Sequence, residues 1–155
     1  MESTAKPVET ITRGRFEPYG RVIEFSPGCT EQFERIVTET ESPWRVAVYR
    51  YSEKSARVLE KHPGSMETLE PLEGVTLLLV APCSAPGSYA AFLLDKPVCL
   101  YKGIWHQLIA VTDTAAVKIT ENAEVSSEFY RFEEDIGLFA GAVPARRAGA
   151  GRESE

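Results

Sequence analysis

The stretch Glu60-Lys61-His62-Pro63-Gly64-Ser65-Met66-Glu67 decides the fold of this chain. In an extended strand the side chains alternate, so Glu60 and His62 point to one face and Lys61 to the other. Pro63-Gly64 predicts a turn, after which Glu67 returns toward the same point. The second of the two histidines, His106, follows later in Gly103-Ile104-Trp105-His106. Imidazoles and carboxylates together predict a site for a divalent metal ion.

Length and charge restrict the class of protein. The chain has 155 residues, which suits one domain with a buried core, and its net charge of −6 argues against a nucleic-acid or anionic-membrane surface. No apolar run approaches the about 18 residues that span a bilayer, and no apolar segment follows the N-terminal charges, so we expect a cytoplasmic protein. Its three cysteines are Cys29, Cys83 and Cys99. Their odd number and the lack of CxxC spacing favour small hydrophobic roles over disulfides or structural zinc.

The pattern from Pro43 onward is that of β-strands. Residues 44–51 alternate, with Trp44, Val46, Val48 and Arg50 on one face, so that Arg50 either points into a cavity or ends the strand in solvent. Residues 75–81 are continuously apolar, as in a strand covered on both faces. Further strands are expected at 21–25, 55–62, 66–70, 89–94, 98–101, 107–112, 115–120 and 128–132. About ten short strands without a βαβ rhythm predict an all-β sandwich or barrel.

The expected domain organisation is simple. Residues 1–13 are polar and form a flexible N-terminal arm with at most one short strand, residues 14–144 form a single domain, and residues 145–155 form a disordered tail rich in Gly, Ala and charge. Residues 30–41 fit a helix and a strand equally well.

Two spacings resemble the cupin motifs. His62-x4-Glu67-x6-Gly74 is similar to the second half of the first motif, and Tyr101-x-Gly103-x-x-His106 is similar to the second, with Tyr in place of Pro. The resemblance implies a cupin-type jelly-roll β-barrel with short peripheral helices. It also implies that His62, Glu67 and His106 hold a metal, while Glu60 replaces the first histidine of the motif.

Three longer segments resemble the ureidoglycolate lyase family within the cupins. They are RFEPYGRVIE at 15–24, VLEKHPGSMETLEPLEG at 58–74 and YKGIWHQLIAV at 101–111. The resemblance implies a cytoplasmic homodimer with a divalent metal (Ni, Zn, Mn or Fe) that splits ureidoglycolate into glyoxylate and urea during purine catabolism and allantoin degradation. This is carbon-nitrogen lyase chemistry of the amidine-lyase type. The chain departs from the family at Glu67, usually Gln, and at Tyr101, usually His.

The reaction predicts further roles. Glu60 is the candidate base for the substrate hydroxyl, and Tyr101 or Lys102 is the candidate acid for the leaving nitrogen. A guanidinium matches a carboxylate with two hydrogen bonds, and large rings form pocket walls. The predicted substrate-binding residues are therefore Arg50, Arg57 and Trp105.

Three other interpretations stay open from the sequence. The departures at Tyr101 and Glu67 favour a related cupin enzyme that acts on another 2-hydroxy or 2-oxo acid. A catalytically idle cupin would bind a small acid as a sensor or storage module. In a metal-free pocket, Glu60, His62 and His106 would act by hydrogen bonding alone. In each case the partner is a small carboxylic acid, without nucleic acid or membrane.

Overall fold

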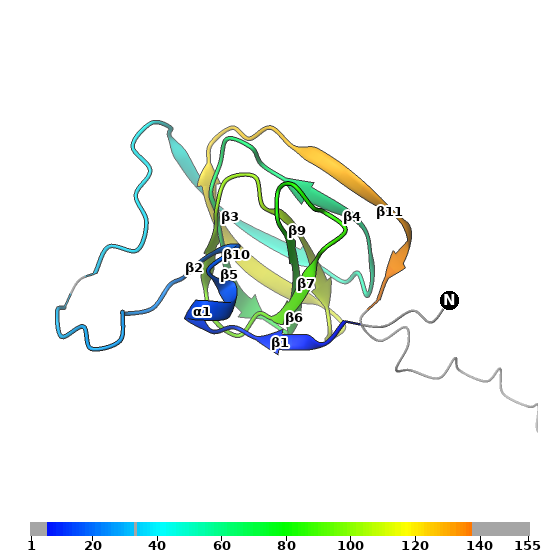
Figure 1. Cartoon of the computed structure of the whole chain (residues 1–155), viewed down its shortest axis with the longest axis horizontal. Coiled ribbons are helices and arrows are strands. Elements are labelled where there is room, and N and C mark those ends of the chain that lie inside the picture. The colour runs from blue at the N-terminus through cyan, green and yellow to red at the C-terminus, as the bar shows by residue number, and fades with distance from the viewer. Residues whose placement is uncertain (1–5, 33, 138–155) are drawn as a thin grey trace, which may run out of the picture.

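Two β-sheets face each other in the computed structural model, which describes residues 6–32 and 34–137 (Figure 1). The six-stranded sheet has the order β1 (Val8–Thr10), β7 (Ala90–Leu93), β6 (Thr76–Ala81), β9 (Trp105–Ala110), β4 (Ala56–Lys61) and β11 (Glu128–Ile136). The five-stranded sheet has the order β2 (Gly20–Val22), β8 (Val98–Leu100), β5 (Glu67–Glu73), β10 (Ala115–Asn122) and β3 (Trp44–Tyr51). The prediction of an all-β jelly-roll architecture is confirmed, and the described part has one short helix, α1 (Arg13–Phe16).

The main core lies between the two sheets. Leu78 and Val80 of β6 pack there together with Leu69 and Val117 from the five-stranded sheet. Side chains alternate along β6, so its neighbouring residues, Leu79 among them, join a second apolar cluster. Every residue of β6 is buried. This confirms that the continuously apolar stretch is a strand covered on both faces.

The turn between β5 and β6 requires glycine. Gly74 has φ +66°, and a Cβ atom there would lie 2.3 Å from Thr112 Oγ1 and 2.3 Å from Thr114 O. Both the left-handed backbone and the lack of space exclude a larger residue. The cupin-like spacing from His62 to Gly74 therefore ends in a physically necessary glycine, which fixes how β5 reverses into β6.

The structure refines the predicted bounds of several segments. Within the predicted N-terminal arm, β1 pairs with β7 in parallel, while all other strand pairs are antiparallel. Among the described residues of 30–41, which exclude residue 33, no helix or strand forms. Strand β9 begins at Trp105, two residues before the predicted start at 107. The predicted tail, 145–155, lies outside the described residues.

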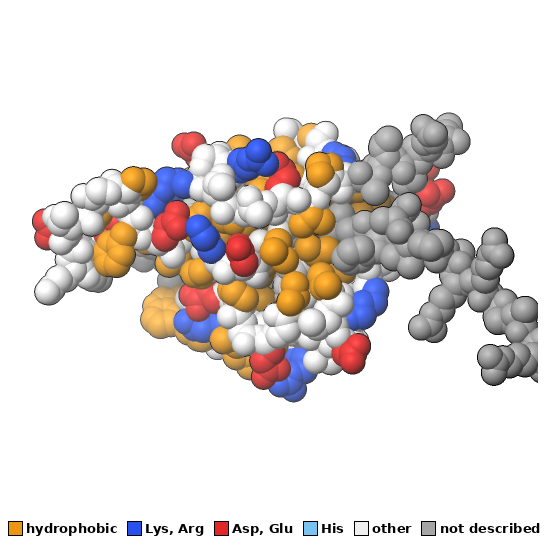
Figure 2. Space-filling model, turned by 90° about the horizontal axis from the view of Figure 1, so that it is seen from below, with side chains coloured by type: hydrophobic (Ala, Val, Ile, Leu, Met, Phe, Trp, Pro, Cys, Tyr) orange, Lys and Arg blue, Asp and Glu red, His pale blue; other side chains and the backbone are white. Residues whose placement is uncertain are grey.

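Charged side chains of both signs lie on the face seen in Figure 2. Figure 2 shows the molecule from below, where basic and acidic side chains are interspersed among apolar ones. All three cysteines are free. No helix within residues 6–32 and 34–137 has the length and apolar character to cross a bilayer.

Candidate metal centre

The centre is built by two strand pairs, one from each sheet. In the six-stranded sheet, β4 and β9 pair antiparallel with Glu60 opposite His106, and His62 follows directly after β4. In the five-stranded sheet, Glu67 of β5 lies opposite Glu121 of β10. These side chains meet between the sheets, where the two cupin-like segments are also joined by a hydrogen bond from Gly103 N to His62 O of 2.9 Å.

The three predicted metal ligands converge at short distances. Glu67 Oε2 lies 2.8 Å from His106 Nε2 and 3.4 Å from His62 Nε2. One ligand atom from each of the three residues lies within 4.8 Å of the others, and all three residues are buried. Glu67 Oε2 has no hydrogen bond of good geometry within the described structure. A buried carboxylate oxygen facing two imidazole nitrogens fits a divalent cation.

The opposite side of each imidazole ring is already engaged. His106 Nδ1 lies 3.0 Å from Ile104 O, and His62 Nδ1 lies 3.2 Å from Ser126 O. A carbonyl oxygen only accepts hydrogen bonds, so each Nδ1 carries a proton and the neutral ring presents its lone pair at Nε2. A hydrogen bond from the far ring nitrogen to a carbonyl oxygen orients metal-binding histidines in general. It is the feature that most directly prepares the site for a metal.

The carboxylate of Glu67 favours the protonated, positively charged form of both histidine rings. Contact with Glu67 raises the pKa of His62 to about 9, against an opposing effect of burial. Burial also opposes charge on His106, but the Glu67 carboxylate outweighs it and raises that pKa as well. Burial alone would raise the pKa of Glu67, and the two histidines instead lower it to about 2. The cluster therefore holds either protons or a cation.

Glu121 adds a buried carboxylate that the sequence reasoning missed. Its Oε2 lies 3.8 Å from His62 Nε2, while its Oε1 accepts hydrogen bonds from Arg45 Nε at 3.1 Å and Nη2 at 2.6 Å. Like charges directly opposite on neighbouring strands repel, so the pairing of Glu121 with Glu67 needs compensation. Arg45 and the imidazoles supply that compensation.

A cavity of about 320 Å³ opens onto the centre. Glu60 lies at its mouth, where its Oε1 accepts a hydrogen bond of 2.8 Å from Ser127 Oγ and lies 3.5 Å from His62 Nε2. The other side chains that line it, besides the ligands, are Arg45, Tyr49, Gln107, Leu108, Ile119, Glu121 and Val125. The cavity thus combines a carboxylate, a guanidinium and a phenol within reach of the metal ligands.

The other predicted site residues do not line this cavity. Two arginines form exposed ion pairs, Arg50 with Glu73 and Arg57 with Asp135, both at 3.3 Å. Arg50 therefore ends its strand in solvent rather than pointing into a cavity.

Three predicted site residues that precede His106 also lie outside this cavity, namely Tyr101, Lys102 and Trp105. Lys102 pairs with Glu39 at 3.2 Å, and Tyr101 is exposed beside the segment that contains α1 and β2. Trp105 Nε1 donates to Cys83 O, and Lys61 Nζ lies 4.6 Å from the centroid of the Trp105 ring. Since β9 begins at Trp105, that ring and His106 point to opposite faces.

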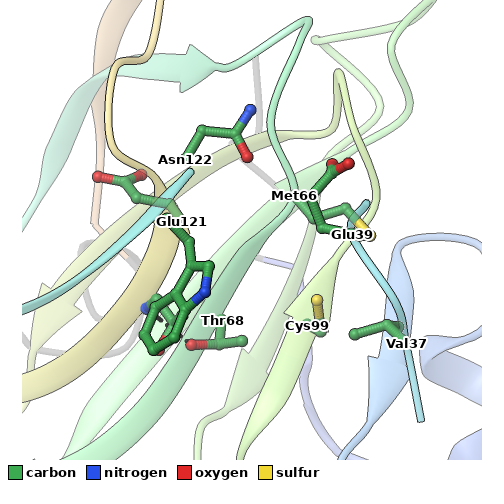
Figure 3. Close-up of a pocket in the computed structure, with 9 residues that line it drawn as sticks. Val37, Glu39, Met66, Thr68, Cys99, Glu121 and Asn122 are labelled. Carbon is green, nitrogen blue, oxygen red and sulfur yellow. Dashed lines mark hydrogen bonds between the residues drawn. The ribbon is translucent and has the colours of Figure 1, made fainter. Parts of the chain in front are cut away.

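A second cavity of about 260 Å³ lies on the other side of the five-stranded sheet, lined by Thr68 and Thr120, the chain neighbours of Glu67 and Glu121. Figure 3 shows Glu121 on one side of this cavity and Val37 on the other, with the Glu121 carboxylate pointing away. At Cys99, which lies in it, burial raises the pKa of the thiol to about 11, so that this thiol stays protonated. The reactive groups therefore gather in the first cavity.

Comparison with solved structures identifies the architecture. The chain is similar to a dTDP-4-dehydrorhamnose 3,5-epimerase from Elizabethkingia anophelis NUHP1, with a TM-score of 0.50 and 12% identity over 64% of this chain and 62% of that one. It is also similar to a sugar phosphate isomerase from the cupin superfamily of Silicibacter pomeroyi, with a TM-score of 0.44 and 15% identity over 60% and 59% of the two chains. The fold is a cupin fold.

An oxalate decarboxylase from Bacillus subtilis aligns with a TM-score of 0.43 and 13% identity over 58% of this chain and 24% of its own. The alignments cover less than two thirds of each of these three known chains. No protein family and no curated protein sequence matches the chain. At these identities the likeness establishes the fold and not the reaction.

Proposed function

We propose that this cupin fold carries a metal-assisted lyase that cleaves ureidoglycolate into glyoxylate and urea. The observation that supports it most is the convergence of His62 Nε2, His106 Nε2 and the buried Glu67 Oε2 beside an open cavity. The choice of substrate rests on the resemblance of the motif segments to the ureidoglycolate lyase family. The cytoplasmic location of the protein belongs to the same proposal.

The cavity supplies a group for each part of such a substrate. Arg45 can accommodate the carboxylate through the N–H groups of its guanidinium that do not donate to Glu121 Oε1, since Nε and Nη2 each use one donor there. A divalent metal held by His62, Glu67 and His106 would lower the pKa of the substrate hydroxyl by coordinating its oxygen. The substrate would thereby bind with its hydroxyl at the centre and its carboxylate at Arg45.

Proton movements complete the reaction. Glu60 takes the hydroxyl proton, the C–O bond becomes the carbonyl of glyoxylate, and the C–N bond to the ureido nitrogen breaks. Tyr49 lines the same cavity and its phenol is protonated at neutral pH, as a phenol ordinarily is, so it is the group that donates a proton to the leaving nitrogen. Solvent at the cavity mouth then returns the proton from Glu60 to Tyr49. The net change is one proton moved from oxygen to nitrogen.

A turnover assay tests the reaction. Purified protein supplemented with Mn²⁺, Ni²⁺ or Zn²⁺ should release urea and glyoxylate from ureidoglycolate in equal amounts. Ligand binding without turnover would instead identify a small-acid-binding cupin, and turnover of a different hydroxy or oxo acid would identify a related enzyme. If His106→Ala leaves the activity intact, the proposed centre is wrong.

Matched variants separate the cavity residues from the earlier candidates. Arg45→Gln should raise KM about 10- to 100-fold, because a charged hydrogen bond to the carboxylate is lost. Arg57→Gln, which removes an arginine from an exposed ion pair outside the cavity, should leave KM unchanged. Tyr49→Phe should lower kcat about 100-fold, whereas Tyr101→Phe should not. Equal effects within either pair would contradict the assignment.

A further inference from the structure

A third cavity, of about 270 Å³, lies where α1 meets β2, and the proposed reaction makes no use of it. Strand β2 is the outermost strand of the five-stranded sheet, and α1 lies beside it (Figure 1). The residues that line the cavity are Arg13, Glu17, Gly20, Arg21, Val22 and Tyr101. Two of the segments singled out in the sequence, 15–24 and 101–111, therefore meet at this cavity.

Strand β2 presents backbone N–H groups without an acceptor to this cavity. In an antiparallel ladder, alternate residues bond to the neighbouring strand and the residues between them point the other way. Tyr101 N donates to Tyr19 O at 3.0 Å, so Arg21, two residues further along, also faces β8. The N–H groups of Gly20 and Val22 then point to the open edge, and neither has an acceptor among the described residues. Both residues are buried, so these donors indicate a ligand in the cavity.

Arg21 adds a positive charge that is not neutralised. Its side chain is half-buried, and within residues 6–32 and 34–137 it forms neither an ion pair nor a hydrogen bond. The second guanidinium of the cavity is fixed in place, since Arg13 Nη2 donates to Phe25 O at 3.0 Å and Nη1 to Ser26 Oγ at 3.3 Å. The hydroxyl of Tyr101 has no partner in the described part of the chain. The cavity thus offers a guanidinium, a phenol and two backbone donors.

The charge of the lining restricts the ligand to a monoanion. Among the described residues that line the cavity, Glu17 is the single acid, so two guanidinium groups and one carboxylate give a formal charge of +1. A carboxylate ligand balances this charge, whereas a phosphate dianion would leave an excess of negative charge beside Glu17.

We infer that this cavity is a second ligand site, separate from the metal centre, that binds the carboxylate of a small monocarboxylic acid. A carboxylate accepts two parallel hydrogen bonds from the Arg21 guanidinium. The hydroxyl of Tyr101 and one N–H of the strand edge, from Gly20 or Val22, donate to its remaining lone pairs. The ligand thereby supplies acceptors to groups that have none within the chain.

Nuclear magnetic resonance of the isotope-labelled full chain tests the site without reference to any activity. Titration with sodium acetate at constant ionic strength should shift the amide resonance of Gly20 or Val22 until it saturates. The amide of Arg21 should shift less, because its N–H faces β8. Shifts that grow linearly without saturating, or saturation by inorganic phosphate at lower concentration than by acetate, would overturn the inference. Either result would leave the proposed reaction at the metal centre unaffected.

Variants with opposite expected effects identify the groups that bind acetate. Arg21→Gln should raise the dissociation constant about 10-fold or more, because charged hydrogen bonds are lost. Glu17→Gln should lower it about 3- to 5-fold, because a like charge is removed. Arg131→Gln, a matched loss of an arginine on β11 in the other sheet, should leave it unchanged. With unchanged circular dichroism spectra, an equal effect of the two arginine variants, or weaker binding by Glu17→Gln, would contradict the assignment.

Discussion

Metal affinity at the centre formed by His62, Glu67 and His106 is expected to rise with pH. The Glu67 carboxylate raises the pKa of His62 to about 9, so this ring is protonated at neutral pH. A metal needs the lone pair that the proton occupies, and binding therefore releases the proton. Below the pKa, each proton displaced weakens the apparent affinity tenfold per pH unit.

The size of the effect follows from this competition. One pH unit corresponds to about 1.4 kcal/mol per proton, so the apparent affinity should increase about 100-fold between about pH 6 and about pH 8 if His62 alone releases a proton. The pKa of His106 is raised too, so release of a proton from that ring as well would make the increase larger.

Isothermal titration calorimetry with Mn²⁺ or Ni²⁺ measures both quantities. The dissociation constant should fall steeply with pH, and repeating the titration in buffers of different protonation enthalpy should show at least one proton released per metal. His106→Gln should lose tight binding, whereas Glu60→Gln, which keeps all three ligands, should retain it. A dissociation constant that does not change with pH, with no proton release, would refute the assignment of these imidazoles as ligands.

The remaining predictions concern stability. The contact between protonated His62 and Glu67 stabilises the metal-free protein fully below pH 6.5, the ordinary pKa of histidine, and this stabilisation is lost as the pH rises through the raised pKa of about 9. Scanning calorimetry should therefore show a Tm that falls over this pH range. A constant Tm would argue against the charged pair. Gly74→Ala should lower the free energy of unfolding in urea by about 2 kcal/mol or more, because the left-handed backbone conformation and the lack of room for a Cβ atom admit only glycine there. Leu78→Ala should cost about 2 to 5 kcal/mol by leaving a core cavity, with a reduced urea midpoint, whereas Leu72→Ala, at an exposed position, should cost little.

Local patterns in the sequence were enough to predict the fold. The alternation of β3 predicts its bounds, 44–51, as the structure has them, and the apolar run of β6 predicts a strand buried on both sides. The intervals from His62 to Glu67 and Gly74 depend on one strand, one turn and the next strand. Because such short-range geometry is set by backbone sterics and turn chemistry, the placement of Glu67 and Gly74 relative to His62 was within reach of sequence reasoning, whereas His106 was added by its resemblance to the second cupin motif.

Which residues share the cavity depended on strand ends and faces. The predicted strand at 115–120 ended one residue before Glu121, although Val117, Ile119 and Glu121 follow the inward alternation and could have indicated it. The predicted start of β9 at 107 likewise concealed that Trp105 and His106 must point apart. A shift of one or two residues in a strand boundary changes which side chains are placed on its inner face.

The sequence by itself determined the all-β class and the turns, because these depend on intervals within a few residues, whereas the set of His62, Glu67 and His106 came from the resemblance to the two cupin motifs. Only the tertiary structure decided that Arg45, and not Arg50 or Arg57, faces the metal-site cavity. The apolar face of β3 was the natural choice for the inner face, yet it points outward and the polar face lines the cavity. Alternation along a strand determines which side chains share a face, whereas the packing of the two sheets decides which face lies inside.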